Sequence, residues 1–283
     1  MPINIRINNR AVSTLQVGEV IAQSAYYGQS FVFITAFDPD AATYIEAVEA
    51  ADEQTLEAGV KLAIDVFVTG CKADGIWDAI KVSCILAGAR TLNGALVPLA
   101  GDAPTNFNFV SADYDRVTGL KGDASTKYLD SNRSNAADPQ DNNHNAVFVS
   151  EFSSDTGIHL GTKSGVSGPN GLFFTAGRHS GHSRRNPSTS SIIDPASLGF
   201  LAITRSSPSG WLIRNSSELT VSDSSQEPTP ENVLLFARKS SSDNLEFISD
   251  GRLTFYSVGE STDLAALDAR LTTLMTEIEG ALT

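Results

Sequence analysis

Histidine and arginine side chains gather in one short stretch of the sequence, GRHSGHSRRN. The residues concerned are Arg178, His179, His182, Arg184 and Arg185. Two histidines this close could ligate zinc if the fold supplied further ligands, but the flanking arginines would repel a cation. We therefore interpret the stretch as a solvated basic loop. Such a loop could contact an acidic neighbouring subunit or bind acidic sugars.

Oxygen-bearing side chains are concentrated in the polar segment NRSNAADPQDNNHN, which predicts a long surface loop. Asp138, Asp141, Asn142 and Asn143 are residue types that suit calcium. The segment lacks the twelve-residue EF-hand pattern with its bidentate glutamate. A solvated loop is the favoured interpretation, with calcium as the alternative. No other cofactor is predicted.

Motifs for catalysis are not recognisable in the sequence. SGVSG does not have the spacing of a nucleophile elbow, and none of the four histidines lies in the context of a catalytic triad. With 33 acidic residues, no carboxylate pair for glycoside cleavage is singled out. We predict that the protein is not an enzyme. A glycan-degrading enzyme on a jelly-roll scaffold is a less favoured alternative.

Trp211 follows a hairpin turn in ITRSSPSGWLIRN, and two interpretations of it are open. An exposed indole could stack on a sugar ring, whereas a buried one would fill the core. The core interpretation is favoured because tryptophan is on average highly buried. Cys71 and Cys84 each lie in an apolar stretch and are expected to be reduced core residues.

Composition indicates a β-rich chain of 283 residues, 41% hydrophobic and only 19% charged. The net charge of −13 disfavours nucleic acid and anionic membranes as partners. No apolar run approaches the length of a membrane span. No nucleic-acid contact and no membrane insertion are therefore expected.

The pattern of apolar residues divides the chain into four parts. Residues 1–37 hold two strand-like pieces, INIRIN and SFVFITAF, that suit a docking arm. Residues 38–95 form a helical module with helices starting at Asp38, Asp52 and Asp74. Residues 96–260 carry evenly spaced strands typical of an antiparallel β-sandwich. The clearest strands are 145–152, 171–177, 199–206, 210–215, 232–238 and 251–258.

Residues 261–283 predict a C-terminal amphipathic helix capped by Ser261 or Thr262. Its apolar positions are Leu264, Leu267, Leu271, Leu274 and Ile278. The spacing of three and four fits a helix that lies on the sandwich, which is the favoured interpretation. It also fits a coiled-coil seam between copies of the chain, with a trimer as the favoured assembly.

Several segments resemble a laminin-G-like, concanavalin A-type jelly roll. TGLKGDASTKYLDSNR resembles its opening strands, and FLAITRSSPSGWLIRN its central hairpin. NVLLFARKSSSDNLEFISDGRLTFYSVGES is similar to its closing segment. The order of these pieces after DGIWDAIKVSCILAGARTLNGALVPL and APTNFNFVSADYDRVTGLKGD resembles tailed-bacteriophage virion proteins over residues 38–282.

This resemblance implies a structural component of a virion that is assembled in the host cytoplasm. The function it implies is a tail fibre or spike whose lectin-like domain attaches to host-surface glycans. A capsid decoration or head-fibre protein is the alternative. Other virion proteins, further copies of the chain and a cell-surface glycan are the partners it implies.

Overall fold

The computed structural model describes residues 37–184 and 191–283, together with four short strands nearer the N-terminus. These are β1 (Ile5–Ile7), β2 (Arg10–Val12), β3 (Ala22–Tyr27) and β4 (Ser30–Thr35). They pair as two antiparallel hairpins, β1 with β2 and β3 with β4. β1 and β4 fall on the two predicted strand-like pieces. Their side chains, and with them the predicted docking role, lie outside the described residues.

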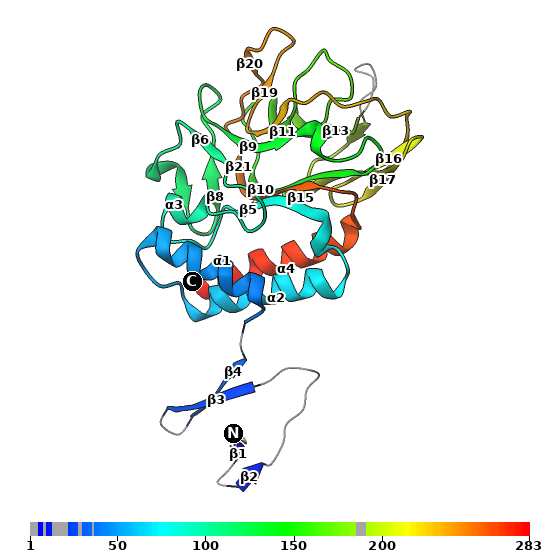
Figure 1. Cartoon of the computed structure of the whole chain (residues 1–283). Helices are drawn as coiled ribbons and strands as arrows, with labels where there is room; N and C mark the ends of the chain where they lie inside the picture. Colours follow the sequence, from blue (N-terminus) through cyan, green and yellow to red (C-terminus); the bar gives the residue numbers. More distant parts are fainter. Residues whose placement is uncertain (1–4, 8–9, 13–21, 28–29, 36, 185–190) are drawn as a thin grey trace.

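Two antiparallel sheets form the centre of the molecule (Figure 1). The first, here called the helix-side sheet, contains β17 (Glu218–Ser222), β16 (Gly210–Arg214), β15 (Gly199–Ser207), β10 (Asn143–Glu151), β21 (Arg252–Gly259), β8 (Gly119–Lys121), β7 (Tyr114–Asp115) and β5 (Ile80–Ile85). The second, here called the distal sheet, contains β14 (Ser191–Ile193), β13 (Arg178–His182), β12 (Gly171–Thr175), β11 (Gly157–Gly161), β18 (Asn232–Leu235), β9 (Tyr128–Ser134) and β6 (Thr105–Phe107). The predicted antiparallel β-sandwich is confirmed.

Shorter elements complete the chain. The helices are α1 (Pro39–Asp52), α2 (Ala58–Ala73), α3 (Leu92–Ala95) and α4 (Leu264–Leu282). The 3₁₀ turns are η1 (Trp77–Ala79), η2 (Ser111–Asp113) and η3 (Asn135–Ala137), and β19 (Arg238–Lys239) pairs with β20 (Leu245–Glu246) in a hairpin. None of the described helices has the length and apolar character to cross a membrane.

The molecule has three layers, because the helix-side sheet packs against the distal sheet on one face and against helices on the other. On β10, Val147 packs between the two sheets, whereas its neighbour Ala146 packs against the helices. The same alternation places Leu201 inside the sandwich and Ala202 under the helices. Because both faces of these strands are apolar, α1, α2 and α4 must cover the second one (Figure 1). Both cysteines are buried and free, as predicted.

The third predicted helix is wrong. Residues 77–79 form a single 3₁₀ turn, and the apolar run that follows is the strand β5. β5 pairs antiparallel with β21, with Ser83 opposite Ser257. Pairing with a distant strand decides the conformation of this short apolar run, whose pattern alone suits either element. The segment predicted as a helical module therefore contributes a strand to the sandwich.

Helix ends also differ in part from the prediction. Asp38 caps α1 as expected, by accepting a hydrogen bond from Asp40 N at 3.0 Å. Asp52 does not cap α2 but ends α1, and its carboxylate accepts hydrogen bonds from the backbone of Arg90 and Thr91. The residue that caps α4 is Asp263 rather than Ser261 or Thr262.

The predicted coiled-coil seam is used within the chain. Leu264, Leu267, Leu271, Leu274 and Ile278 are all at most 2% exposed. They lie in one apolar cluster with α1, α2 and the outer face of the helix-side sheet. These five side chains are therefore not available to a seam between copies, and the alternative of a helix lying on the sandwich is the one observed.

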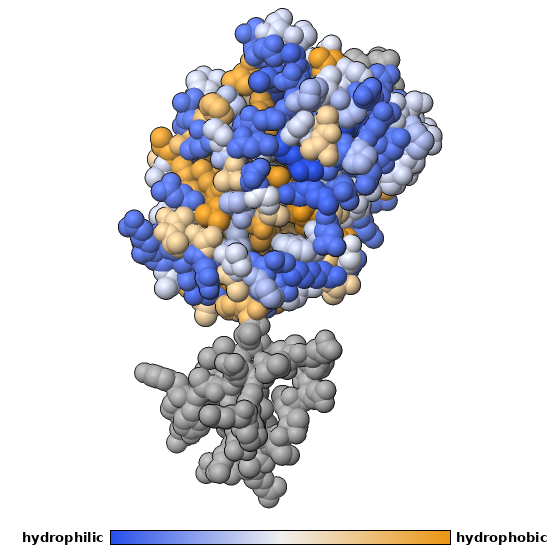
Figure 2. All heavy atoms as spheres, in the orientation of Figure 1, coloured by the Kyte–Doolittle hydropathy of each residue, from blue (hydrophilic) through white to orange (hydrophobic). Residues whose placement is uncertain are grey.

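Hydrophilic residues cover most of the visible surface of the sandwich, with smaller hydrophobic groups between them (Figure 2). The segments around the helices, residues 38–78 and 260–283, contain fifteen acidic and three basic residues. Residues 79–259, which hold nearly all of the sandwich, contain seventeen acidic and fifteen basic residues. The acidic excess of the chain is therefore concentrated beside the helical layer.

Candidate functional site

The outer face of the distal sheet is the sheet surface that the helices leave uncovered. On β12, Leu172 and Phe174 are buried, whereas Phe173 and Thr175 point away from the core. On β13 the alternation continues with Ser180 on the outer face. Polar and aromatic side chains on this face can remain in contact with solvent, so no helix is needed to cover them.

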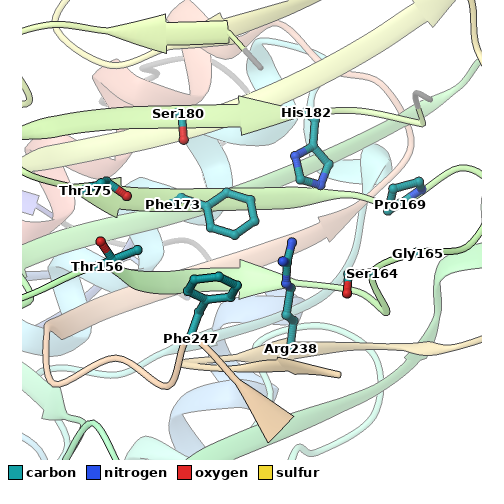
Figure 3. A pocket seen from close by; sticks show the side chains of 10 residues that line it. All are labelled: Thr156, Ser164, Gly165, Pro169, Phe173, Thr175, Ser180, His182, Arg238 and Phe247. Atoms are coloured by element: carbon teal, nitrogen blue, oxygen red, sulfur yellow. The ribbon is translucent and has the colours of Figure 1, made fainter. Parts of the chain in front are cut away.

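A cleft of about 310 Å³ lies on this face. Its floor comes from β12 and β13, and its walls from the hairpin β19–β20 and a loop at residues 164–169. The lining residues are Thr156, Ser164, Gly165, Pro169, Phe173, Thr175, Ser180, His182, Arg238 and Phe247 (Figure 3). They come from segments far apart in the sequence, and the fold brings them together.

The guanidinium of Arg238 lies beside two phenyl rings of the cleft. Its guanidinium carbon is 5.0 Å from the centroid of Phe173 and 4.8 Å from that of Phe247. The two rings stand edge to face, with their centroids 6.3 Å apart. Cation–π attraction holds the guanidinium in this position. The cluster combines apolar ring surface with a charged donor in one place.

The guanidinium is also fixed from its other side. Arg238 Nε donates a hydrogen bond to Glu246 Oε1 at 2.7 Å, and Ser164 Oγ donates to the same oxygen at 2.7 Å. The contact between Ser164 and Glu246 ties the hairpin to the loop on the opposite wall of the cleft. The position of Arg238 is therefore set by the protein before any ligand arrives.

Phe247 is held in an unusual backbone conformation. Its φ is 52°, in the left-handed region that a bulky residue rarely adopts, and its side chain is 43% exposed. Its carbonyl accepts a hydrogen bond from Ile158 N at 2.9 Å, which anchors the segment to β11. Strain of this kind costs of order 1–3 kcal/mol and is concentrated at functional sites. An exposed aromatic ring is thus presented at the expense of stability.

Hydroxyl groups complete the lining. Within the part of the chain that the structure describes, the side-chain hydroxyls of Thr156, Thr175 and Ser180 form no hydrogen bond. The ring of His182 lies 5.2 Å from that of Phe173, at a tilt of 37°. The cleft therefore offers aromatic surface, neutral donors and acceptors, and one guanidinium.

The stretch predicted as a basic loop is instead the strand β13 and the two residues after it. Arg178 is exposed and pairs with Asp194 at 2.8 Å, while Arg184 is only 1% exposed. Of the four predicted residues that the structure describes, His182 alone lines the cleft. Arg185 lies outside the described residues. Alternation along a strand explains why neighbouring residues here have opposite environments.

His179 points into the sandwich rather than toward solvent. Its ring nitrogens approach the carbonyl oxygens of Phe173 and Ser197 at 3.4 and 3.2 Å. Its ring lies 5.4 Å from that of His159, and burial lowers the pKa of both imidazoles, that of His159 to about 3. The described residues contain no group of three or more histidine, cysteine, aspartate or glutamate side chains that could hold a metal ion.

Trp211 is a core residue. It is 2% exposed and belongs to the apolar cluster between the two sheets. Its predicted alternative role as a platform for a sugar ring is therefore wrong. The favoured core interpretation of this residue is the one observed.

The segment with the proposed calcium ligands is only partly a surface loop. Arg133 donates two hydrogen bonds to the carboxylate of Asp138, at 3.0 and 2.5 Å. Asn142 Oδ1 accepts hydrogen bonds from Ser261, and Asn143 is a buried residue of β10. Calcium binding at this segment stays a prediction.

Phe173, Arg238 and Phe247 were not singled out by sequence reasoning. The available signal was an aromatic residue, Phe247, in the polar surroundings of SSSDNLEFISDG. The pairing of β19 with β20 brings Phe247 into the cleft, because it folds this segment over the distal sheet. No short-range pattern brings Phe173 to the same place.

No protein-family model matches the chain, and no curated protein matches it either. Among solved structures it is similar to the binding domain of botulinum neurotoxin serotype D, with 9% identity, 72% of this chain and 52% of that chain covered, and a TM-score of 0.49. It is also similar to the CBM40 of the IT-sialidase of Ruminococcus gnavus, with 14% identity, 49% and 91% covered, and a TM-score of 0.37. The chain spans about half the length of the neurotoxin domain, 52%. These likenesses are too distant to assign a ligand.

Proposed function

We propose that this protein binds a glycan without cleaving it, and that the glycan occupies the cleft on the distal sheet. The observation that carries the proposal is the cluster of Phe173, Arg238 and Phe247, which lines the cleft together with free hydroxyl groups. Sugar rings have apolar C–H faces that pack on aromatic rings, and hydroxyls that exchange hydrogen bonds with polar groups. The cleft presents both kinds of surface together.

The size of the cleft supports a short carbohydrate rather than a macromolecule. Its volume of about 310 Å³ lies at the lower end of small-molecule sites, which span roughly 300–1,000 Å³. The pairing of β12 with β13 fixes its floor, and the hydrogen bonds of Glu246 fix its walls, so that little ordering is needed on binding. One or two sugar units fit these dimensions.

The absence of cleavage is part of the proposal. Glycoside hydrolysis needs two carboxyl groups flanking the bond. None of the ten residues that line the cleft in the described chain is an aspartate or a glutamate, and nearby Glu246 is engaged by Arg238 and Ser164. Incubation with host polysaccharide should release no new reducing ends, and their appearance would contradict this part.

The decisive experiment is a glycan array probed with the full chain, followed by titration of the best ligand. Phe247→Ala should weaken binding about tenfold, since loss of an aromatic contact costs of order 1 kcal/mol or more. The matched control is Leu219→Ala on β17, because Leu219 is 42% exposed and Phe247 43%. Equal affinities of the two variants would place the ligand elsewhere.

We further propose, from the sequence resemblance over residues 38–282, that the protein belongs to a phage virion as a tail fibre or spike. In that role the distal sheet would face the host surface. A capsid decoration or head-fibre protein is the alternative. Immunogold labelling of intact particles separates the two, because it locates the protein at the tail or on the head.

Assembly with other copies, with a trimer favoured, stays part of this proposal. It cannot use the five apolar side chains of α4, which are buried within the chain. Any trimer would have to form through other surfaces. Sedimentation equilibrium of the purified chain gives the mass directly, and a monomer at all concentrations would contradict the assembly.

A further inference from the structure

We infer that the cleft selects a neutral sugar over an acidic one. This inference rests on the proposed glycan binding and names the class of glycan. In it, Arg238 donates to sugar hydroxyls while Glu246 beside it balances its charge, so that Arg238 is not an anion-binding site on its own.

The charge of Arg238 is already balanced within the protein. Its Nε lies 2.7 Å from Glu246 Oε1, and the two side chains are 16% and 29% exposed. A ligand carboxylate approaching Arg238 would also approach Glu246, which carries the same sign as the ligand. Repulsion by a fixed like charge is an effective way to reject a wrong partner. An uncharged ligand meets no such repulsion.

The cations around the cleft are balanced as well. Lys163 lies on the adjoining loop and pairs with Asp243 at 2.8 Å. Lys239, next to Arg238 in the hairpin, lies 4.0 Å from Glu231. Among the residues that the structure describes, the surroundings of the cleft therefore show no excess of the positive charge that draws a carboxylate into a site.

The orientation of Arg238 also suits hydroxyl groups. The phenyl rings of Phe173 and Phe247 lie near its guanidinium, and its end points toward the space between Phe173 and His182 (Figure 3). Hydroxyls of Thr175 and Ser180 are on the same floor. A sugar hydroxyl is donor and acceptor at once, so it can satisfy a wall of mixed groups that a carboxylate, which only accepts, cannot.

One substitution should reverse the selectivity. Glu246→Gln keeps the size of the side chain and an oxygen that can accept from Arg238 and Ser164, but it removes the negative charge. The cleft then carries the uncompensated charge of Arg238. Glu231→Gln is the matched control, because it also removes one negative charge, but Glu231 pairs with Lys163 and Lys239 and not with Arg238.

The experiment titrates the full chain with a neutral sugar and with its uronic acid, two ligands that differ only in the oxidation of one carbon. It is run at about pH 8, where an ordinary imidazole is neutral, in about 50 mM and about 500 mM sodium chloride. The sugar pair is taken from the family of the best array ligand. Wild type should bind the neutral member at least about tenfold more tightly, with little change between the two salt concentrations.

Glu246→Gln should gain affinity for the uronic acid by about tenfold, and this gain should disappear at high salt. Glu231→Gln should behave as wild type. A wild type that prefers the uronic acid would overturn the inference and leave the proposed glycan binding intact. Failure to bind any glycan on the array would overturn both, so the two failures are distinguishable.

Discussion

The two sheets of the sandwich differ in their outer faces, because helices cover one of them and the other carries an open cleft. The outer face of the helix-side sheet carries Phe200 and Ala202 from β15, and α4 lies across it. The outer face of the distal sheet carries Phe173 from β12 and Ser180 from β13, and a cleft lies there instead. The residues at alternate positions of a strand thus decide whether its second face is covered or left for a ligand.

The balance of acidic and basic residues also differs between the helical layer and the sandwich. The segments around the helical layer hold fifteen acidic and three basic residues, whereas residues 79–259 hold seventeen and fifteen. Near the cleft, charged side chains such as Arg238 and Glu246 occur in pairs. One end of the molecule is therefore closed by apolar contacts and strongly acidic outside, and the other is nearly balanced and open. The predictions that follow change one side of this comparison at a time.

The largest effect is expected from removing the helical cover. In the double variant Leu267→Ala and Leu271→Ala, two fully buried side chains are truncated, at a cost of about 2–5 kcal/mol each. That total approaches the whole stability of a typical domain, so urea should unfold the variant at a much lower concentration. Ala269→Ser, on the exposed side of α4, should change the midpoint little. Loss of self-association without loss of stability would show that these leucines join copies instead.

Trp211→Ala should cost about 3–5 kcal/mol of unfolding free energy, because the indole fills the core between the sheets. Thermal unfolding measures the loss. Glycan affinity, corrected for the folded fraction, should be unchanged. A loss of affinity with full stability would restore the tryptophan as a ligand contact.

Acid should destabilise the protein through its buried imidazoles. Burial lowers the pKa of His159 to about 3 and that of His144 to about 4. The unfolded chain binds these protons from about pH 6.5 downward, whereas the folded chain stays neutral until about pH 4. The free energy of unfolding is therefore highest above pH 6.5. As the pH drops toward 4, each of these histidines lowers it by about 1.4 kcal/mol per pH unit.

Urea titrations at several pH values measure this slope. The His159→Phe variant should lose less unfolding free energy per pH unit than wild type, by about 1.4 kcal/mol, because one buried imidazole is removed. The substitution breaks no hydrogen bond in the described chain, since both ring nitrogens of His159 lack a partner there. Carboxylates with a lowered pKa, such as Asp123 at about 2, add their own loss only below about pH 4. A stability that is constant between pH 6.5 and 4 would contradict the neutral burial of these rings.

The smallest effect on stability is expected in the cleft. In Phe247→Gly the exposed ring is lost, but the left-handed backbone at this position becomes unstrained. These two changes oppose each other, so the unfolding free energy should stay within about 1 kcal/mol of wild type. Chemical denaturation checks this value. A large destabilisation would mean that the ring holds the hairpin in place rather than serving a ligand.

The sequence alone was sufficient for most of the sandwich. The strands predicted at 145–152, 199–206 and 210–215 correspond to β10, β15 and β16, and the terminal helix is α4. Local alternation and turn residues define these elements, as in the hairpin where Ser207 pairs with Gly210. Predictions failed where a long-range partner decides the conformation, as for β5 and β13.

The candidate site was largely beyond reach of the sequence. Its central contact joins Phe173 of β12 to Arg238 of β19. These two residues are distant along the chain and lie in different elements. Whether a histidine faces solvent or the core depends on the register of β13, which places His179 inside and His182 in the cleft. Only the assembled sheet supplies that register.

Hydrogen exchange with and without the best array glycan tests most directly which face of the molecule binds. Amides of β12, β13 and residues 238–247 should become more protected when glycan is added, and those of α2 and α4 should not change. Protection confined to the helical layer, or to the edge strand β17, would contradict the assignment of the ligand to the distal sheet.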